Sequence, residues 1–158
     1  MTPTTVTAKI TTPSDREIRI EREFNAPRAR VWRAFTHAEL VAQWWGRGQT
    51  VVVERLELAR GGRWRFVEQG ARGPMGFEGR FREVKAPERL VRSFEWDGMP
   101  AHVIIETIGF EDLSDGRTRV ITTQQFHTPE ERDGFLASGV QVGMDQAYAG
   151  LDRVLAEA

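Results

Sequence analysis

In the first part of the chain, the spacing of apolar residues changes from every second position to the spacing of a helix. Residues 16 to 24 alternate between polar and apolar positions, with isoleucine or phenylalanine on three of the even ones. A period of two indicates a half-buried β-strand. Pro27 then suits the first turn of a helix, and Val31, Ala34 and Phe35 have the spacing of a buried helical stripe. The pattern therefore predicts a strand followed by a short helix.

A second short helix is predicted immediately afterwards. Thr36 and Glu39 have the spacing of a capping box, in which a hydroxyl caps the helix and a carboxylate three residues later bonds back. The helix would begin near His37, carry the adjacent Trp44 and Trp45, and end at the glycines that follow. Because neighbouring residues on a helix point about 100° apart, at most one of the two tryptophans is expected to be fully buried.

Six later segments read as β-strands separated by turns. Asp97-Gly98 and Ser114-Asp115-Gly116 are tight-turn signals. The spacing is typical of an antiparallel meander, with strands expected at about residues 50–58, 63–67, 76–84, 89–96, 101–110 and 117–126.

The C-terminal part is predicted to be helical. Thr128 to Glu131 have the spacing of a second capping box, with Pro129 at the first helical position. From Val140 to Leu155 apolar residues recur every three or four positions, which indicates a long amphipathic helix. The order of elements predicts an α+β fold: a curved antiparallel sheet of about six to seven strands wrapped on a long C-terminal helix, with two short helices after the first strand. A sheet that grips a helix in this way often leaves a cavity between them.

Length and composition fit one globular domain. A chain of 158 residues, 40% hydrophobic and 28% charged, suffices for one core and is short for two. We expect residues 1–14 to form a flexible tail and residues 15–158 to form one domain. No apolar run approaches the roughly 20 residues of a membrane span, and residues 1–13 lack the apolar stretch of a secretory signal. No membrane span is therefore expected.

Charge and cysteine content narrow the classes of function. The formal net charge is −1 and the arginines are interleaved with acidic residues, so no nucleic-acid partner is expected. The absence of cysteine excludes disulfides, thiol nucleophiles and thiolate metal sites, and fits a cytoplasmic location. His37, His102 and His127 fall in different elements without metal-site spacing, so we expect neither a metal nor another cofactor.

One candidate acid/base pair lies on the strand expected at residues 101–110. His102 and Glu106 occupy the same alternate positions of this strand as the apolar Ile104 and Ile108, so all four are expected on one face. If this face points into a cavity, the two would form a polar pair that is able to transfer protons. The alternative is that His102 lies at the solvated end of the strand and Glu106 pairs with a neighbouring arginine.

Aromatic residues provide the stronger indication of a binding site. Gly139, Gly143 and Gly150 each weaken a helix by about 1 kcal/mol relative to alanine, which makes sense where the helix passes close to other groups. A cavity lined by aromatic side chains with a few polar groups is the usual small-molecule site. The alternative is an ordinary packed core. The residues expected to contact a ligand are Trp44, Trp45, Phe66, Phe77, Phe81, Phe94, Trp96, Ile104, Met144 and Tyr148.

A series of short motifs also follows in order along the chain. They are Ala26-Pro27, Val31-Trp32, Phe35, Trp44-Trp45-Gly46, Gly61-Gly62-Arg63-Trp64, Gly79, Val84 to Val91, Phe110-Glu111-Asp112, Gly116 to Val120, Glu131-Arg132-Asp133, Ser138-Gly139, Gly143 and Leu151-Asp152. Over roughly residues 16 to 156 the sequence resembles the START-like or SRPBCC superfamily. Within it, the sequence is most similar to the group homologous to the C-terminal domain of the activator of the heat-shock-protein-90 ATPase.

The resemblance implies a helix-grip fold of the START or Bet v type and a range of functions. The superfamily includes lipid carriers, aromatase/cyclases, hormone receptors, resistance proteins and co-chaperone modules. The activator carries an additional N-terminal chaperone-binding domain, and we expect these 158 residues to form only the pocket-type domain.

The leading interpretation is a protein that binds a small hydrophobic or aromatic molecule between the sheet and the terminal helix. It would act as a carrier, a sensor or a sequestering protein, and an enzyme is the less favoured interpretation. Two alternatives stay open: a polyketide-cyclase-like enzyme that uses His102 and Glu106, and a protein-interaction module like the chaperone activator. The sequence leaves both a chaperone partner and a homodimer open.

Overall fold

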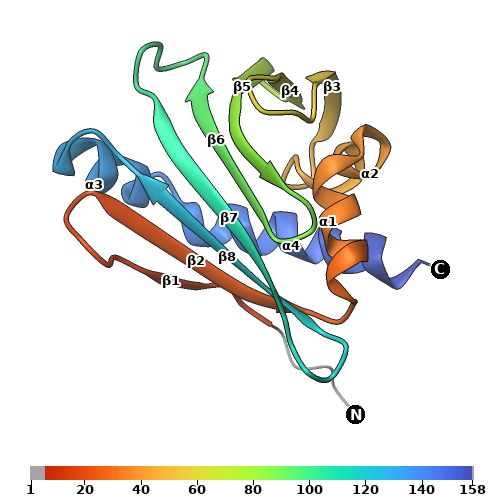
Figure 1. Cartoon of the computed structure of the whole chain (residues 1–158). Coiled ribbons are helices and arrows are strands. Elements are labelled where there is room, and N and C mark those ends of the chain that lie inside the picture. Colours follow the sequence, from red (N-terminus) through yellow and green to blue (C-terminus); the bar gives the residue numbers. More distant parts are fainter. Residues whose placement is uncertain (1–5, 158) are drawn as a thin grey trace.

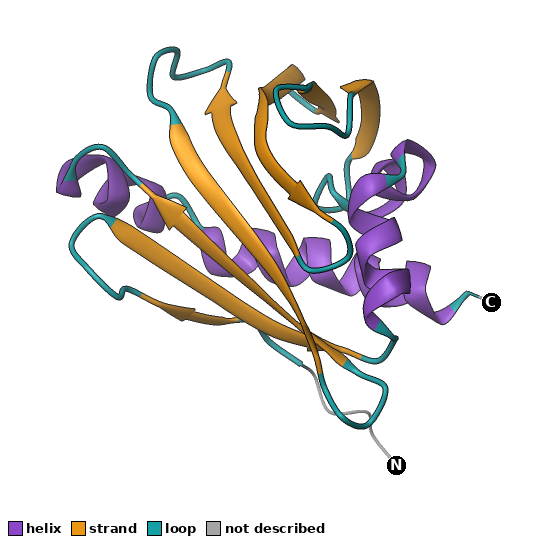
Figure 2. Cartoon of the chain, in the orientation of Figure 1, coloured by secondary structure: helices purple, strands orange, loops and turns teal. Residues whose placement is uncertain are grey.

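The computed structural model describes residues 6–157 as an eight-stranded antiparallel sheet and four helices (Figures 1 and 2). The sheet order is β1-β2-β8-β7-β6-β5-β4-β3, so the last strand lies beside β2. The strands are β1 (Lys9–Thr11), β2 (Glu17–Phe24), β3 (Thr50–Leu56), β4 (Arg63–Gly70), β5 (Gly73–Lys85), β6 (Arg89–Trp96), β7 (Ile104–Asp112) and β8 (Thr118–Gln125). The helices are α1 (Arg28–Thr36), α2 (Ala38–Trp44), α3 (Pro129–Ala137) and α4 (Val140–Ala156).

The helices are arranged around one face of the curved sheet, which is the expected helix-grip fold. Figure 1 shows α4 crossing behind the strands, with α3 at one end of it and α1 and α2 near the other. Every second residue of β2 and β8 is buried, as the two-residue period predicts. Phe24 of β2 meets Tyr148 of α4 edge to face, with ring centroids 5.0 Å apart, so the buried side of the sheet faces α4.

The two halves of α4 differ in burial. From the middle of the helix onward Ala147, Leu151 and Leu155 are buried, as their spacing predicts. In the N-terminal half Val140 and Met144 belong to the same stripe but are only partly buried. The stripe is therefore continuous in sequence, while only its C-terminal part is covered by core residues.

The sheet has one strand more than the upper value that the sequence predicts, because residues 9–11 are not part of a loose tail. Lys9–Thr11 pairs antiparallel with residues 19–21 of β2. Next to this strand, the Ala8 N–H donates to Asp145 Oδ1 (2.9 Å), and Gln141 Nε2 donates to the Ala8 carbonyl (2.9 Å). Contacts with α4 thus fix the segment that the sequence assigns to the tail. Residues 1–5 of that predicted tail lie outside the described residues.

One of the two predicted capping boxes forms. At α3, the Thr128 side chain accepts from the Glu131 N–H (3.1 Å), and the Glu131 carboxylate accepts from the Thr128 N–H (3.3 Å). The prediction at Thr36 is wrong. Thr36 is the last residue of α1, and its hydroxyl donates to the Trp32 carbonyl one turn earlier (2.8 Å). His37 is the N-cap residue of α2, and its side chain forms no capping hydrogen bond.

Candidate functional site

A cavity of about 710 Å³ lies between the sheet and the N-terminal half of α4. This volume is within the usual range of roughly 300–1,000 Å³ for small-molecule sites. Its walls come from α1 and α2, strands β2 and β4 to β8, the β6–β7 loop, α3 and α4. The aromatic residues among them are Phe35, Trp44, Trp45, Phe77, Phe94, Trp96, Phe126, Phe135 and Tyr148.

Eight of the ten residues expected to contact a ligand line this cavity. They are Trp44, Trp45, Phe77, Phe94, Trp96, Ile104, Met144 and Tyr148. Phe66 and Phe81 do not line it: they are 1% and 2% exposed and belong to the core beside it. Phe66 packs against Trp45, at a centroid distance of 5.1 Å, so it supports a wall residue without lining the cavity itself.

The adjacent tryptophans differ as the helical geometry predicts. Trp44 is buried, and its Nε1 donates to the Ala34 carbonyl of α1 (2.8 Å). Trp45 is half-buried and packs edge to face on Phe77 as well as on Phe66. One ring therefore fixes α2 to α1, while the other forms part of the cavity wall.

At two of its glycines α4 passes close to other groups, as expected, and these groups belong to the protein itself. A Cβ at Gly150 would lie 3.3 Å from Trp44 Cα, so α4 passes close to α2 there. A Cβ at Gly143 would lie 3.0 Å from Arg47 Cδ, so the Arg47 side chain crosses α4 at this point. Gly139 precedes α4 with a left-handed φ of 94°, which glycine adopts without strain.

His102 and Glu106 both line the cavity but do not form a pair. His102 lies in the β6–β7 loop, its side chain is 49% exposed, and its Nδ1 contacts Glu131 of α3. Glu106 is buried in β7, where it accepts from Arg92 Nε (2.9 Å) and from Gln124 Nε2 (3.0 Å). Both carboxylate oxygens are therefore occupied as acceptors. This is the alternative that the sequence left open, and it does not favour proton transfer between the two residues.

The buried polar row beneath the cavity comes from three neighbouring strands. Arg92 of β6 is in register with Glu106 of β7, which is in register with Gln124 of β8. The Arg92 guanidinium also lies over the Trp64 ring, 4.5 Å from its centroid. Arg92 and Gln124 are not among the predicted site residues. The sequence could have pointed to them, because each is a polar residue at an alternate position of its strand, on the same face as buried apolar residues.

A second ion pair lies at the edge of the cavity near α2. Arg47 donates to buried Glu68 through Nε (3.2 Å) and Nη2 (2.8 Å), and both residues line the cavity. Arg47 holds a left-handed φ of 53°, which is unusual for a residue with a side chain. The loop after α2 is thereby joined to β4 across the wall.

Two groups at the cavity have shifted pKa values. Burial raises the pKa of the Tyr148 hydroxyl, so this group stays neutral at ordinary pH. At the opposite end, the hydrogen bond with His102 holds the pKa of Glu131 below its usual range. The inner wall thus offers a neutral phenol, and the rim holds a carboxylate that is already paired.

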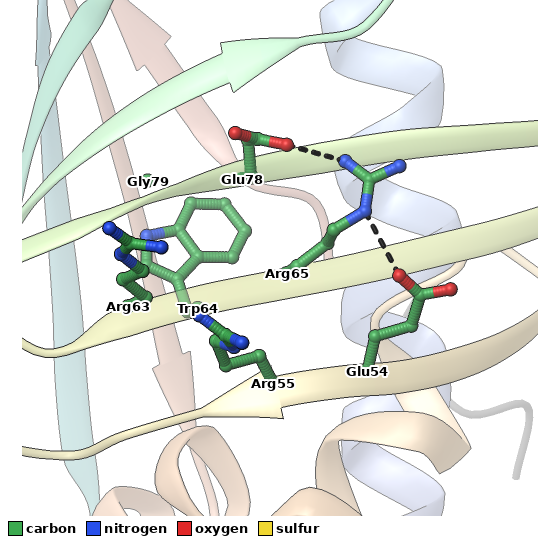
Figure 3. Close-up of a pocket in the computed structure, with 7 residues that line it drawn as sticks. All are labelled: Glu54, Arg55, Arg63, Trp64, Arg65, Glu78 and Gly79. Atoms are coloured by element: carbon green, nitrogen blue, oxygen red, sulfur yellow. Dashed lines mark hydrogen bonds and ion pairs between the residues drawn. The ribbon is translucent and has the colours of Figure 1, made fainter.

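A smaller hollow of about 340 Å³ lies on the outer side of β3, β4 and β5 (Figure 3). Figure 3 shows Arg65 directed at Glu54 and Glu78, to which it donates at 3.0 Å and 2.6 Å. Arg65 also forms a two-bond contact with Asp97. Because these charges already neutralise one another at the surface, the hollow is an ion-pair cluster and a poor candidate for a ligand site.

Two further properties of residues 6–157 concern metal sites and membrane-spanning helices. Within this range, no three side chains of histidine, cysteine, aspartate or glutamate gather as a metal site would require. None of the helices in the same range has the length and apolar character needed to cross a membrane.

Comparison with known proteins identifies the family. Residues 25–156 match the family model described as "Activator of Hsp90 ATPase homolog 1-like protein". The chain belongs to this family. Members of the activator of Hsp90 ATPase homolog 1-like family are of the START/SRPBCC type, so the resemblance seen in the sequence is confirmed. No curated protein matches the sequence significantly.

Solved structures support the fold of this family member. A protein from Rhodobacter sphaeroides is 29% identical, with a TM-score of 0.88, over 96% of this chain and 99% of its own. A protein from Arthrobacter aurescens is 24% identical, with a TM-score of 0.85, over 98% and 94%. An HSP90 activator from Plasmodium falciparum is 20% identical, with a TM-score of 0.56, over 70% and 73%. The last two likenesses concern the fold alone.

Proposed function

We propose that this protein binds a small, mainly apolar molecule in the cavity between the sheet and α4. The observation that carries the proposal is the cavity itself, which has about 710 Å³ and nine aromatic residues in its walls. Membership of a START/SRPBCC-type family, whose members typically bind hydrophobic ligands, is consistent with this function. A carrier, a sensor or a sequestering protein would each use such a site.

The half-buried walls supply the driving force for binding. Trp45, Phe77 and Met144 are partly buried and line the cavity, so a ligand would remove apolar surface from water. Each buried CH₂ contributes about 0.8 kcal/mol. A ring system of moderate size can therefore reach about −8 kcal/mol, or micromolar affinity, after the cost of association.

Native mass spectrometry combined with equilibrium dialysis tests this function. We expect either a co-purifying small molecule or uptake of one equivalent of an apolar probe such as 2-ethylnaphthalene by the purified protein. A ligand-free mass together with no uptake of the probe up to its solubility limit would contradict the proposal.

The family description favours one second candidate, which is stimulation of an Hsp90 ATPase. Its test is the rate of ATP hydrolysis by purified Hsp90 with and without this protein. Stimulation that persists when the cavity is occupied by 2-ethylnaphthalene would indicate an interaction module. An unchanged rate would argue against this candidate and leave ligand binding as the function.

A further inference from the structure

We propose that the cavity selects an uncharged aromatic molecule that carries a carbonyl oxygen, and that Arg92 holds this oxygen. The inference rests on the proposed function, because it specifies the ligand of the same cavity. It comes from three features: free donors on a deeply buried arginine, the charge balance around it, and the aromatic walls.

Arg92 has donors that no described residue uses. Its side chain is 6% exposed, it lines the cavity, and it donates to Glu106 only through Nε. The terminal groups Nη1 and Nη2 donate to no described residue, and they are not among the atoms that protein completely encloses. A guanidinium carries five N–H donors in a fixed plane, so four of them have no acceptor among the described residues. A buried donor without an acceptor is unfavourable, and a ligand oxygen would supply one.

Gln124 is a weaker candidate for the same role. Its Nε2 donates to Glu106 Oε2, which fixes the amide orientation and leaves Oε1 without a partner. That oxygen is completely enclosed by protein atoms, so a ligand cannot reach it without rearrangement. Arg92 is therefore the residue assigned to the ligand, and Gln124 orients Glu106.

The charge balance favours a neutral acceptor. Arg92 is already compensated by Glu106, 2.9 Å away, and Arg47 by Glu68, 2.8 Å away. A ligand carboxylate beside Arg92 would bring one uncompensated negative charge into a low-dielectric site and would also face Glu106. A ketone oxygen accepts from Arg92 without changing the net charge.

The walls around Arg92 favour an aromatic body. Phe94 follows Arg92 on the buried side of β6 and lies 5.5 Å from Phe77 between ring centroids, and both line the cavity. Aromatic rings stack or meet edge to face with other aromatic rings more favourably than area alone predicts. An aryl ketone therefore fits both the polar floor and the apolar walls.

Three probes of matched shape test the inference on the unmodified protein. 2-Acetonaphthone carries a neutral carbonyl, 2-ethylnaphthalene lacks it, and 2-naphthoate replaces it with a carboxylate. We expect equilibrium dialysis to show that the ketone binds about tenfold or more tightly than the ethyl compound, as a hydrogen bond to a charged donor implies. The carboxylate is expected to bind more weakly than the ketone.

A double variant tests the assignment to Arg92. Arg92→Met combined with Glu106→Gln removes both charges and keeps an amide beside Gln124. We expect this variant to bind the ketone and the ethyl compound within about twofold of each other. The matched control is Arg22→Met combined with Asp152→Asn, since this buried arginine pairs with Asp152 outside the cavity. The control is expected to keep the preference for the ketone.

The outcomes separate the inference from the proposed function. Equal binding of the ketone and the ethyl compound by the unmodified protein would overturn the inference and leave apolar ligand binding intact. Tightest binding of 2-naphthoate would overturn the requirement for a neutral ligand. A preference that survives in the Arg92 double variant would overturn the assignment to Arg92. Binding of none of the probes would contradict the proposed function and the inference with it. The probe comparison decides the ligand class even if the double variant does not fold.

Discussion

At the scale of residues, the site depends on polar side chains that occupy buried positions of apolar strands. The sequence shows that Glu106 shares parity with Ile104 and Ile108, and the structure places it beneath the cavity. Its partners could be inferred only in part, because strand register decides which arginine meets it. Arg92 does so because β6 pairs with β7 in the register that puts the two residues opposite each other.

Aromatic residues show the same limit. Phe66, Phe77, Phe81 and Phe94 all belong to the strands predicted from alternation. Only Phe77 and Phe94 line the cavity. Phe66 and Phe81 are 1% and 2% exposed, so their neighbours in the folded protein cover them completely, and a local pattern in the sequence does not contain this information.

A residue-scale prediction concerns the outer ion-pair cluster. The hydrogen bond that Arg65 donates to Asp97 holds the pKa of Asp97 below the usual value for aspartate. The pair therefore stabilises the fold above the pKa of the unfolded chain, and this contribution disappears as pH falls through the lowered folded-state pKa. At pH 7 we expect Asp97→Asn to lower the free energy of unfolding by less than about 1 kcal/mol, because the pair is at the surface.

Urea unfolding of Asp97→Asn and the parent between pH 7 and about pH 2 measures this effect. The two stability curves should converge towards acid pH. Binding of 2-acetonaphthone at pH 7 should be the same in both proteins. A difference in stability that grows as pH falls, or a loss of probe binding, would contradict the structural role of the cluster.

At the scale of elements, the period of apolar residues predicts well which segments are helices and which are strands. Short local motifs, such as a capping box, predict less well which contacts form. The three- and four-residue spacing predicts α4, and the capping box at Thr128 forms. The same spacing at Thr36 fails because α1 continues through this residue. Strand β1 is too short to show a period, and it depends on Ala8 meeting Asp145 and Gln141 of α4.

An element-scale prediction follows from the two halves of α4. Leu151 is 0% exposed and belongs to the core, while Met144 is partly buried and lines the cavity. Leu151→Ala should lower the free energy of unfolding by about 2–5 kcal/mol, as buried truncations do. Met144→Ala should cost less than half as much, because fewer core contacts are lost. Urea unfolding of the two variants compares them directly, and equal losses would show that the N-terminal half of α4 is packed like the core.

At the scale of the whole molecule, the C-terminal half of α4 packs directly against the sheet, while the cavity separates the N-terminal half from it. Tyr148, Leu151 and Leu155 are buried along the C-terminal half of α4. The cavity occupies the space under the N-terminal half, where the wall includes Met144, Gly143 and Val140. The order of elements in the sequence predicts the fold and the existence of such a space. Its volume depends on where α3 and the Arg47–Glu68 pair place the rim.

The central claim is that this space receives a ligand, and filling it tests the claim most directly. Met144→Trp adds volume inside the cavity, and Val142→Trp places the same bulky side chain at an exposed position of the same helix, where the parent residue is 63% exposed. The measurement is the affinity for 2-acetonaphthone, with the melting temperature recorded for each protein. We predict that Met144→Trp loses at least tenfold in affinity with little change in melting temperature, and that Val142→Trp binds like the parent. In a filled core the same Met144→Trp change would cost roughly 1–3 kcal/mol through overpacking. A lowered melting temperature of Met144→Trp, together with no binding of the probe by the parent, would contradict the account.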